Sequence, residues 1–272
     1  MPELPEVEAV KNFLKLNFQK KKIIKIKIIN KNLRFEIQNI IKTKLSNLII
    51  TKIYRRGKYL ILLLENNSSL IIHLGMTGYF RMMSEEDKKK HDHLIFYFYS
   101  KVLIFNDVRK FGFIKYYNFL ELNNSKHLKD MGPEPLSDRF NLNYFTKKIK
   151  RKCSVKNLLM NQNFVAGLGN IYCSEILFDA GVNPERICNE LSKEQIKKII
   201  LSTRKILKQA INLGGTTIKN FIVNNEKIGY FKNKLKVYGK ENQSCPRCKT
   251  FATIQRIKQS GRSTFLCTKC QI

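Results

Sequence analysis

Four cysteines near the end of the sequence have the spacing of a metal site. They form the pattern C-x2-C-x18-C-x2-C and are Cys245, Cys248, Cys267 and Cys270. Each C-x2-C turn presents two thiolates to one ion, and four thiolates complete a tetrahedral Zn²⁺ site. Such a site leaves no open coordination position, so the sequence predicts one structural Zn²⁺. The hairpin between the two pairs carries three basic residues suited to nucleic acid: Arg256, Lys258 and Arg262.

The first eight residues, MPELPEVE, carry three glutamates and no basic residue in a chain whose formal net charge is +30. A helix is expected after Pro5, because apolar residues follow at helical spacing (Val7, Val10 and Leu14). Pro5 suits the first helical position, and Glu6 and Glu8 favour the positive end of the helix dipole. The same reasoning does not explain Pro2 and Glu3, because they precede the helix.

A second candidate lies in the stretch AGLGNIY, where Gly167 and Gly169 precede a predicted helix. Glycines let the backbone approach a phosphate, and a helix N-terminus offers free N–H groups. Asn170 adds a side-chain donor, and a basic stretch precedes it at residues 147–156. A dinucleotide-binding loop is a poor alternative, because the third glycine and the preceding strand are absent. The stretch therefore indicates either a clamp on a DNA backbone or a plain turn between helices.

The composition favours a polyanionic partner. Lys and Arg number 51 against 21 Asp and Glu, and 43% of the 272 residues are hydrophobic. An AT-rich genome would also raise the lysine content, but it does not explain the scarcity of acidic residues. No apolar run has the length of a membrane span, and the odd number of cysteines, seven, argues for a reduced cytosol. Three cysteines outside the zinc pattern are expected to be buried: Cys153, Cys173 and Cys188.

These elements predict an α+β protein. Short β-branched and aromatic runs between residues 22 and 117 indicate an N-terminal antiparallel β-sandwich or barrel, flanked by helices. The Pro/Gly-rich segment MGPEPLSD marks a boundary, and the chain beyond it has helical patterns, most clearly from Ser192 to Asn212. We expect an N-terminal domain at residues 1–131, a linker at 132–138, a helical domain at 139–234 and a zinc finger at 235–272.

The ordered set of motifs resembles the formamidopyrimidine-DNA glycosylase family, from Pro2 to Cys270. It comprises PELPEVE, RRGKYL, HLGMTG, KHDH, RKFG, MGPEPL, GLGNIY, GGTT and the four-cysteine finger. The resemblance implies that the sandwich at residues 1–131 is the catalytic domain, that residues 139–234 form a helix-two-turn-helix DNA-binding domain, and that the chain ends in a zinc-finger hairpin. It also implies a monomeric bacterial enzyme, cytoplasmic and associated with the nucleoid, that excises oxidised purines such as 8-oxoguanine from duplex DNA and cleaves abasic sites.

The resemblance also gives Pro2 and Glu3 a chemical role. Methionine before a small residue such as proline is usually removed, which would leave Pro2 with a free secondary amine. The pKa of an α-amino group is about 8, so a useful fraction is nucleophilic near neutrality. Pro2 would attack the anomeric carbon of the damaged nucleotide, and the resulting iminium permits strand cleavage by β/δ-elimination. Glu3 would shuttle protons, and Glu6 would orient this pair or simply bind the helix start.

Other residues match the family's DNA-contacting positions. Lys58 resembles a second catalytic lysine, and Arg262 resembles the finger arginine that assists the second elimination. The phosphate contacts would be His91, Arg109, Arg151, Lys156 and Asn170. The damaged nucleotide must leave the base stack, and the residues expected to fill the gap are Met76, Arg109 and Phe111. A loop from Gly214 to Tyr230 would close over the everted base.

Three residues depart from the family pattern, and two other functions compete with the main prediction. Val108 replaces a proline, Lys110 replaces an arginine, and Asn161 replaces an aspartate. An endonuclease VIII-type glycosylase for oxidised pyrimidines would share Pro2, Glu3 and the finger. A non-catalytic zinc-ribbon protein that binds nucleic acid would suit the net charge and the finger, but it would form no covalent adduct with DNA.

Overall fold

The structure, a computed structural model, describes residues 2–149, 152–216, 222–223, 226–227 and 229–272. The chain divides into two compact units. The first comprises Met1–Lys129 and Gly214–Tyr230, and the second comprises Asp130–Leu213 and Phe231–Ile272. No helix in these described ranges is long and apolar enough to cross a membrane.

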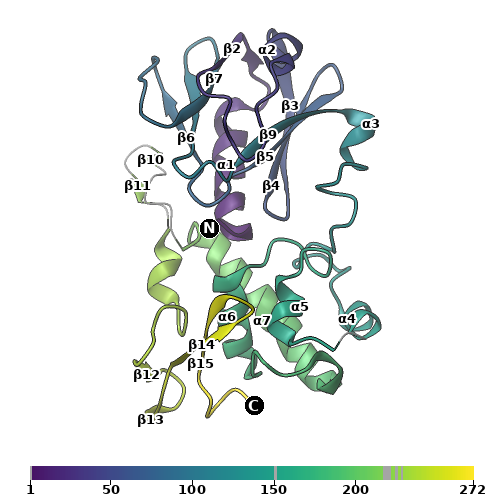
Figure 1. Ribbon diagram of the computed structural model, residues 1–272, viewed down its shortest axis with the longest axis vertical. Helices are drawn as coiled ribbons and strands as arrows, with labels where there is room; N and C mark the ends of the chain where they lie inside the picture. The colour runs from purple at the N-terminus through teal and green to yellow at the C-terminus, as the bar shows by residue number, and fades with distance from the viewer. Residues whose placement is uncertain (1, 150–151, 217–221, 224–225, 228) are drawn as a thin grey trace. The chain divides into compact units, whose positions relative to one another are not determined.

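The first unit is built on two antiparallel sheets (Figure 1). One has the strand order β1-β3-β4-β5-β9 and the other β2-β7-β8-β6. The strands are β1 (Lys22–Ile23), β2 (Lys25–Ile28), β3 (Leu48–Arg56), β4 (Tyr59–Leu64), β5 (Ser68–His73), β6 (Tyr79–Met83), β7 (Asp92–Tyr97), β8 (Val102–Asn106) and β9 (Phe113–Asn118). Residues of both sheets share one buried core, including Leu62, Ile72, Phe96 and Phe105. The predicted β-sandwich is therefore confirmed.

Three helices accompany these sheets: α1 (Leu4–Phe18), α2 (Ile40–Leu45) and α3 (Phe119–Leu122). Helix α1 buries its predicted apolar face, Val7, Val10 and Leu14, in the core shared by the sheets. The first helical residue is Leu4 rather than Pro5, and Glu3 caps the helix. The unit also includes a short hairpin of β10 (Ile222–Val223) and β11 (Glu226–Lys227).

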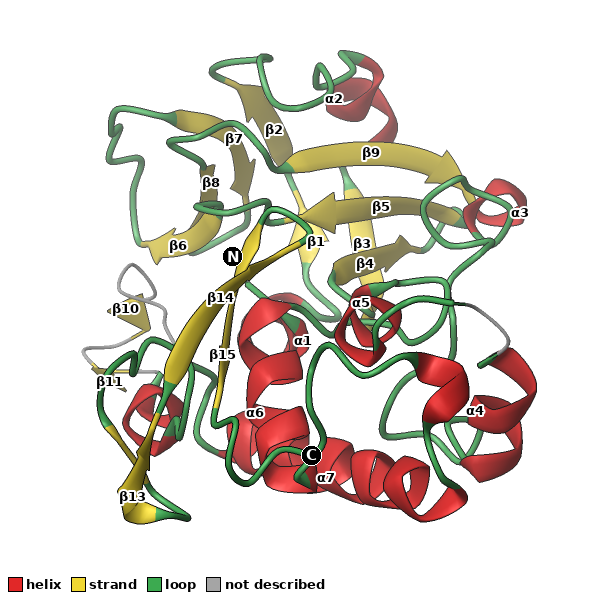
Figure 2. Cartoon of the chain, turned by 60° about the horizontal axis from the view of Figure 1, so that its bottom comes forward, coloured by secondary structure: helices red, strands yellow, loops and turns green. Residues whose placement is uncertain are grey.

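The second unit is mainly helical and ends in the finger (Figure 2). Its elements are α4 (Leu142–Lys148), α5 (Val155–Met160), α6 (Asn170–Ala180), η1 (Cys188–Glu190), α7 (Lys193–Asn212), η2 (Tyr230–Lys234, which begins at the last residue of the first unit), β12 (Ser244–Cys245), β13 (Lys249–Thr253), β14 (Gln255–Gln259) and β15 (Arg262–Leu266). The predicted capping box of Ser192 and Gln195 starts α7. Helices α6 and α7 pack against each other. The α+β class with a helical C-terminal part and a terminal finger is confirmed.

The segment predicted to be a linker is packed onto the second unit. Gly132 N donates a hydrogen bond to Gln162 O at 2.9 Å, and Ala166 N donates to Pro133 O at 3.0 Å. A side chain at Gly132 would place its Cβ 2.3 Å from Phe164 O, so only glycine fits this approach. The domain boundaries given by the sequence stay a prediction.

Candidate functional site

The start of α1 holds the two residues predicted to perform the chemistry. Pro2 is half-buried, and Glu3 and Glu6 are 2% and 1% exposed. Glu3 and Glu6 form a capping box, in which Glu3 N donates to Glu6 Oε2 at 2.8 Å. Glu6 Oε1 accepts from Thr216 N at 2.7 Å and from Thr216 Oγ1 at 3.0 Å. Glu6 therefore fixes the residue beside Pro2 and the start of the segment from Gly214 to Tyr230 at once.

Gly215 is required at this contact. Its φ is +84°, and a Cβ there would lie 2.6 Å from Glu6 Oε1. The predicted closing loop continues beyond Thr216, but residues 217–221, 224–225 and 228 lie outside the described residues. Among the described residues of this loop, Gly215 and Thr216 lie against Glu6.

Lys58 lies in the turn between β3 and β4 and is 8% exposed. An ion pair fixes this turn to α1, because Arg55 Nε lies 2.7 Å from Glu8 Oε2 and Arg55 Nη1 donates to Gly57 O at 2.9 Å. Burial alone would raise the pKa of Glu8, but the hydrogen bonds and charges of Lys11 and Arg55 outweigh it and lower the pKa. Glu8 is thus an ionised anchor between α1 and the Lys58 turn, a role that the dipole argument missed.

The three residues predicted to fill the gap in DNA lie in two loops of the first unit. Met76 follows β5 and is 39% exposed, and Phe111 precedes β9 and is 45% exposed. Arg109 is exposed, and its guanidinium lies 4.9 Å from the centroid of the Phe111 ring. His91, a predicted phosphate contact, accepts a hydrogen bond at its carbonyl from Asp107 N at 3.1 Å, beside the second loop. The structure therefore brings the two loops and His91 to one edge of the sandwich.

In the second unit, Lys156, Asn170 and the residues next to Arg262 form one polar cluster. Lys156 Nζ donates to Asn170 Oδ1 and to Thr264 Oγ1, both at 2.6 Å, and to Ser263 O at 3.3 Å. Asn170 Nδ2 also donates to Ser263 O, at 2.8 Å. Lys156 is only 1% exposed, so its ammonium group contacts these neighbours rather than solvent. Arg151 lies outside the described residues.

Arg262 is exposed at the start of β15, next to a two-residue turn. Ser260 and Gly261 have φ values of +48° and +75°, as in the type I′ turns that join tight hairpins. One departure from the family pattern causes no loss of contact, because Asn161 Oδ1 accepts from Asn163 N at 2.9 Å, as an aspartate would.

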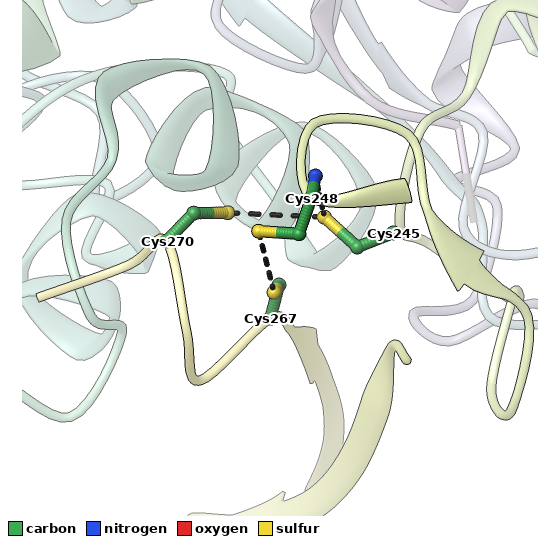
Figure 3. A group of neighbouring side chains, drawn as sticks. All are labelled: Cys245, Cys248, Cys267 and Cys270. Carbon is green, nitrogen blue, oxygen red and sulfur yellow. Dashed lines mark hydrogen bonds between the residues drawn. The ribbon is translucent and has the colours of Figure 1, made fainter. Parts of the chain in front are cut away.

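The four predicted zinc ligands converge (Figure 3). The Sγ atoms of Cys245 and Cys270 are 3.8 Å apart, those of Cys248 and Cys267 are 3.9 Å apart, and all four lie within 4.8 Å of one another. Four thiolates at about 2.3 Å from a tetrahedral ion are about 3.8 Å apart, so the group fits one structural Zn²⁺. Apolar residues of the second unit surround it, including Phe178, Val237 and Phe265.

Sequence reasoning missed two other residues that hold the parts of the site together, Thr216 and Asp107. Thr216 stands in the quoted GGTT motif, but its partner Glu6 is 210 positions away. Asp107 is fully buried and accepts hydrogen bonds from the loops that carry Met76 and Phe111. The nearest signal for Asp107 was the RKFG motif that follows it.

Three family models match the chain in order. The N-terminal domain of formamidopyrimidine-DNA glycosylase matches residues 1–114, its H2TH domain matches residues 131–222, and the zinc finger found in FPG and IleRS matches residues 242–272. Together with the sandwich, the helical unit and the four-thiol site, they define a DNA glycosylase of the helix-two-turn-helix, zinc-finger class.

Named relatives and solved structures narrow this class. The chain is 44% identical over 276 residues to formamidopyrimidine-DNA glycosylase of Rickettsia felis, covering 100% of this chain and 98% of that protein. A Lactococcus lactis Fpg in complex with abasic-site DNA shares 38% identity with a TM-score of 0.92, and a MutM in complex with carbocyclic 8-oxo-G DNA shares 38% with a TM-score of 0.91. Each comparison covers 99% of both chains. The chain belongs to the formamidopyrimidine-DNA glycosylase family.

Proposed function

We propose that this chain is a bifunctional DNA glycosylase and abasic-site lyase of base excision repair, acting on oxidised purines in duplex DNA with Pro2 as nucleophile. The observation that carries the role of Pro2 is the buried pair of Glu3 and Glu6 immediately after it. Similar solved structures contain DNA with an abasic site, Fapy-dG or carbocyclic 8-oxo-G. The similar proteins of Rickettsia felis and Rickettsia africae are bacterial, which supports action on the nucleoid in a bacterial cytoplasm.

The reaction needs a free amine at Pro2, which removal of Met1 supplies. The amine lone pair forms a bond to C1′ of the damaged nucleotide, and the bond from C1′ to the base breaks with its electrons leaving on the base. Glu3 carries the proton lost by the amine to the ring oxygen O4′, so that the C1′–O4′ bond opens and an iminium forms. Loss of a C2′ proton then expels the 3′ phosphate, a second elimination expels the 5′ phosphate, and water releases Pro2.

The remaining residues bind and open the DNA. Lys58 acts near the sugar and its phosphates, and Arg262 assists the second elimination. The phosphate contacts are His91, Arg109, Arg151, Lys156 and Asn170, with buried Lys156 acting through Asn170. Met76, Arg109 and Phe111 fill the space of the everted nucleotide. Zn²⁺ at the four cysteines holds the finger together and takes no part in the chemistry.

Borohydride trapping tests this proposal, because it reduces the iminium to a stable crosslink between protein and DNA. Protein whose intact mass shows that Met1 is absent should crosslink to duplexes containing 8-oxoguanine. An added residue ahead of Pro2 should abolish the crosslink, whereas Pro2→Gly is a weak control because glycine keeps an amine. Cleavage of a thymine glycol duplex with 8-oxoguanine spared would contradict the purine assignment. Absence of a crosslink from verified protein would exclude the Schiff base.

A further inference from the structure

Two neighbouring loops of the first unit present exposed apolar side chains to solvent. The first, between β5 and β6, carries Met76, and the second, between β8 and β9, carries Phe111. Exposed loop residues usually sample several conformations, and ordering them at the moment of binding costs free energy. What fixes these two loops relative to each other therefore affects how readily they enter DNA.

One buried carboxylate joins the two loops. Asp107 is 0% exposed. Its Oδ1 accepts from Thr77 Oγ1 of the first loop at 2.5 Å, and its Oδ2 accepts from Gly112 N of the second loop at 2.8 Å. Arg109 N donates to Thr77 Oγ1 at 3.0 Å and lies 3.3 Å from Asp107 Oδ1. We call Asp107, Thr77 and the amides of Arg109 and Gly112 the Asp107 cluster.

The two loop backbones also touch directly. Gly75 has a φ of +62°, and a Cβ there would lie 2.3 Å from Gly112 N and 2.4 Å from Phe111 C. On the other side, Gly75 N donates to His73 Nδ1 at 3.0 Å. The backbone of Asp107 is held as well, since its N donates to His91 O and its carbonyl lies 3.0 Å from His93 Nε2. Hydrogen bonds thus join the Asp107 cluster to His93 in β7 and to His91 just before it. The close backbone contact at Gly75 restricts the movement of the two loops relative to each other.

We propose that Asp107 and Thr77 are positioning residues for strand opening, which hold Met76 and Phe111 in one arrangement before DNA binds. This inference rests on the proposed function, because it needs a nucleotide that must be everted. Charge-assisted hydrogen bonds to a buried carboxylate are stronger than neutral ones, which suits a rigid joint. Neither residue touches the reacting atoms in this role. Both act through the loops that they join.

Thr77→Val tests the proposal, because it removes the hydroxyl and keeps the side-chain shape. Single-turnover rates are measured on a duplex with 8-oxoguanine opposite cytosine and on the same duplex with a preformed abasic site, which has no base to evert. We expect base excision to fall about tenfold or more, as loss of a hydrogen bond to a charged group predicts, with abasic-site cleavage within about twofold of wild type. Thr77→Ser keeps the hydroxyl and should restore excision.

A double-mutant comparison separates positioning from a general loss of structure. If the cluster acts through the loops, Thr77→Val should have little further effect on excision in a Met76→Ala, Phe111→Ala background. A 2-aminopurine beside the lesion should report slower unstacking in Thr77→Val alone. If Thr77→Val fails to fold, Thr77→Ala and Asp107→Asn are assayed for the same ratio of rates on the two substrates.

The outcomes distinguish this inference from the proposed function. If the wild type neither excises 8-oxoguanine nor forms a borohydride crosslink, the proposed function fails. If the wild type is active but the variants slow both substrates equally, or Thr77→Ser does not restore excision, the positioning role of the Asp107 cluster is wrong.

Discussion

The start of α1 and the junction of α5, α6 and the finger hairpin are each organised around one buried charged side chain, but the charges have opposite signs. Glu6 accepts hydrogen bonds from Glu3 N, Thr216 N and Thr216 Oγ1. Lys156 donates to Asn170 Oδ1, Thr264 Oγ1 and Ser263 O. Each is 1% exposed, so each contacts the residues that it holds rather than solvent.

The sign decides what each side chain can join. A helix start leaves N–H groups without intrahelical partners, so a carboxylate there binds the helix end and one incoming loop. An ammonium needs oxygens, and Lys156 gathers them from α6 and from β15, beside Arg262. The Glu6 site therefore depends on segments of the first unit. The Lys156 site depends on the hairpin of β14 and β15, which lies in the chain between the two pairs of zinc ligands.

Zinc removal should give the largest difference between the two sites. Structural Zn²⁺ contributes about 10 kcal/mol or more to the folding of small fingers, so a strong chelator should unfold β12–β15. Hydrogen exchange should show loss of protection in β14, β15 and the start of α6, with α1 and β4 unchanged, and DNA affinity should fall. Cys248→Ser should lower the zinc content, whereas Cys153→Ser, outside the four-thiol group, should not. Equal loss of protection in α1 would contradict this independence.

Acid should weaken the first unit before the second, because the first unit contains His73 and His127, two histidines whose pKa burial lowers. Burial first, and then the positive charges of Lys58 and Arg34, lower the pKa of His73 from 6.5 to about 4. The unfolded chain therefore binds the proton first as the pH falls. This stabilisation is complete above about pH 6.5 and is lost toward pH 4, at a cost of about 3 kcal/mol. Burial also lowers the pKa of His127, so this residue changes stability in the same direction. Its contribution is smaller, because solvent screens it more.

In the second unit, Glu175 has the opposite effect on how stability changes as the pH falls. Burial raises its pKa despite the N–H groups of residues 236–238 that it accepts from, so the folded unit binds a proton before the unfolded chain does. Between pH 7 and 5, exchange corrected for its intrinsic rate should therefore increase in β4, β5 and β9 but not in α6. His73→Asn, which keeps an acceptor near the position of Nδ1, should reduce this dependence. Equal increases in both units would show that neither group controls it.

Interactions between residues close together in the chain were predictable from the sequence, and interactions between residues far apart in the chain were not. The capping pair of Glu3 and Glu6 is visible because its members are three positions apart. The metal site is visible because each pair of thiols is set by a local turn. The first of the β-branched runs that predicted the sandwich is divided between the two sheets, because the chain passes from β1 to β2 at Ile24, which is 42% exposed. Pattern shows that a residue suits a strand but not which sheet receives it.

Polar partners far apart in the chain lay beyond sequence reasoning. The resemblance gave Lys156 a phosphate contact, but its partners in β15 are 107 and 108 positions away, and they bury it. Asp107 was invisible for a different reason, since two of its partners are backbone amides, which every residue type except proline provides. Such residues become identifiable only when the fold has brought their partners together.

Lys156→Met should have a smaller effect than acid or zinc removal, and it tests the comparison most directly. Methionine keeps the length and apolar stem but leaves Asn170 Oδ1 without this donor, and a buried acceptor left unpaired costs about 1–3 kcal/mol. Asn170 keeps its bond to Ser263 O, which limits the loss. We expect weaker DNA binding, because Asn170 and Arg262 lose their fixed separation, but normal crosslinking to abasic-site DNA at saturating protein. The matched control is Lys152→Met, which removes the same charge from an exposed lysine four positions away.

If Lys152→Met weakens binding as much as Lys156→Met, net charge explains the effect and the buried ammonium has no special role. If Lys156→Met instead abolishes crosslinking at saturation, the two buried charges serve the same step, and the division drawn between them is wrong.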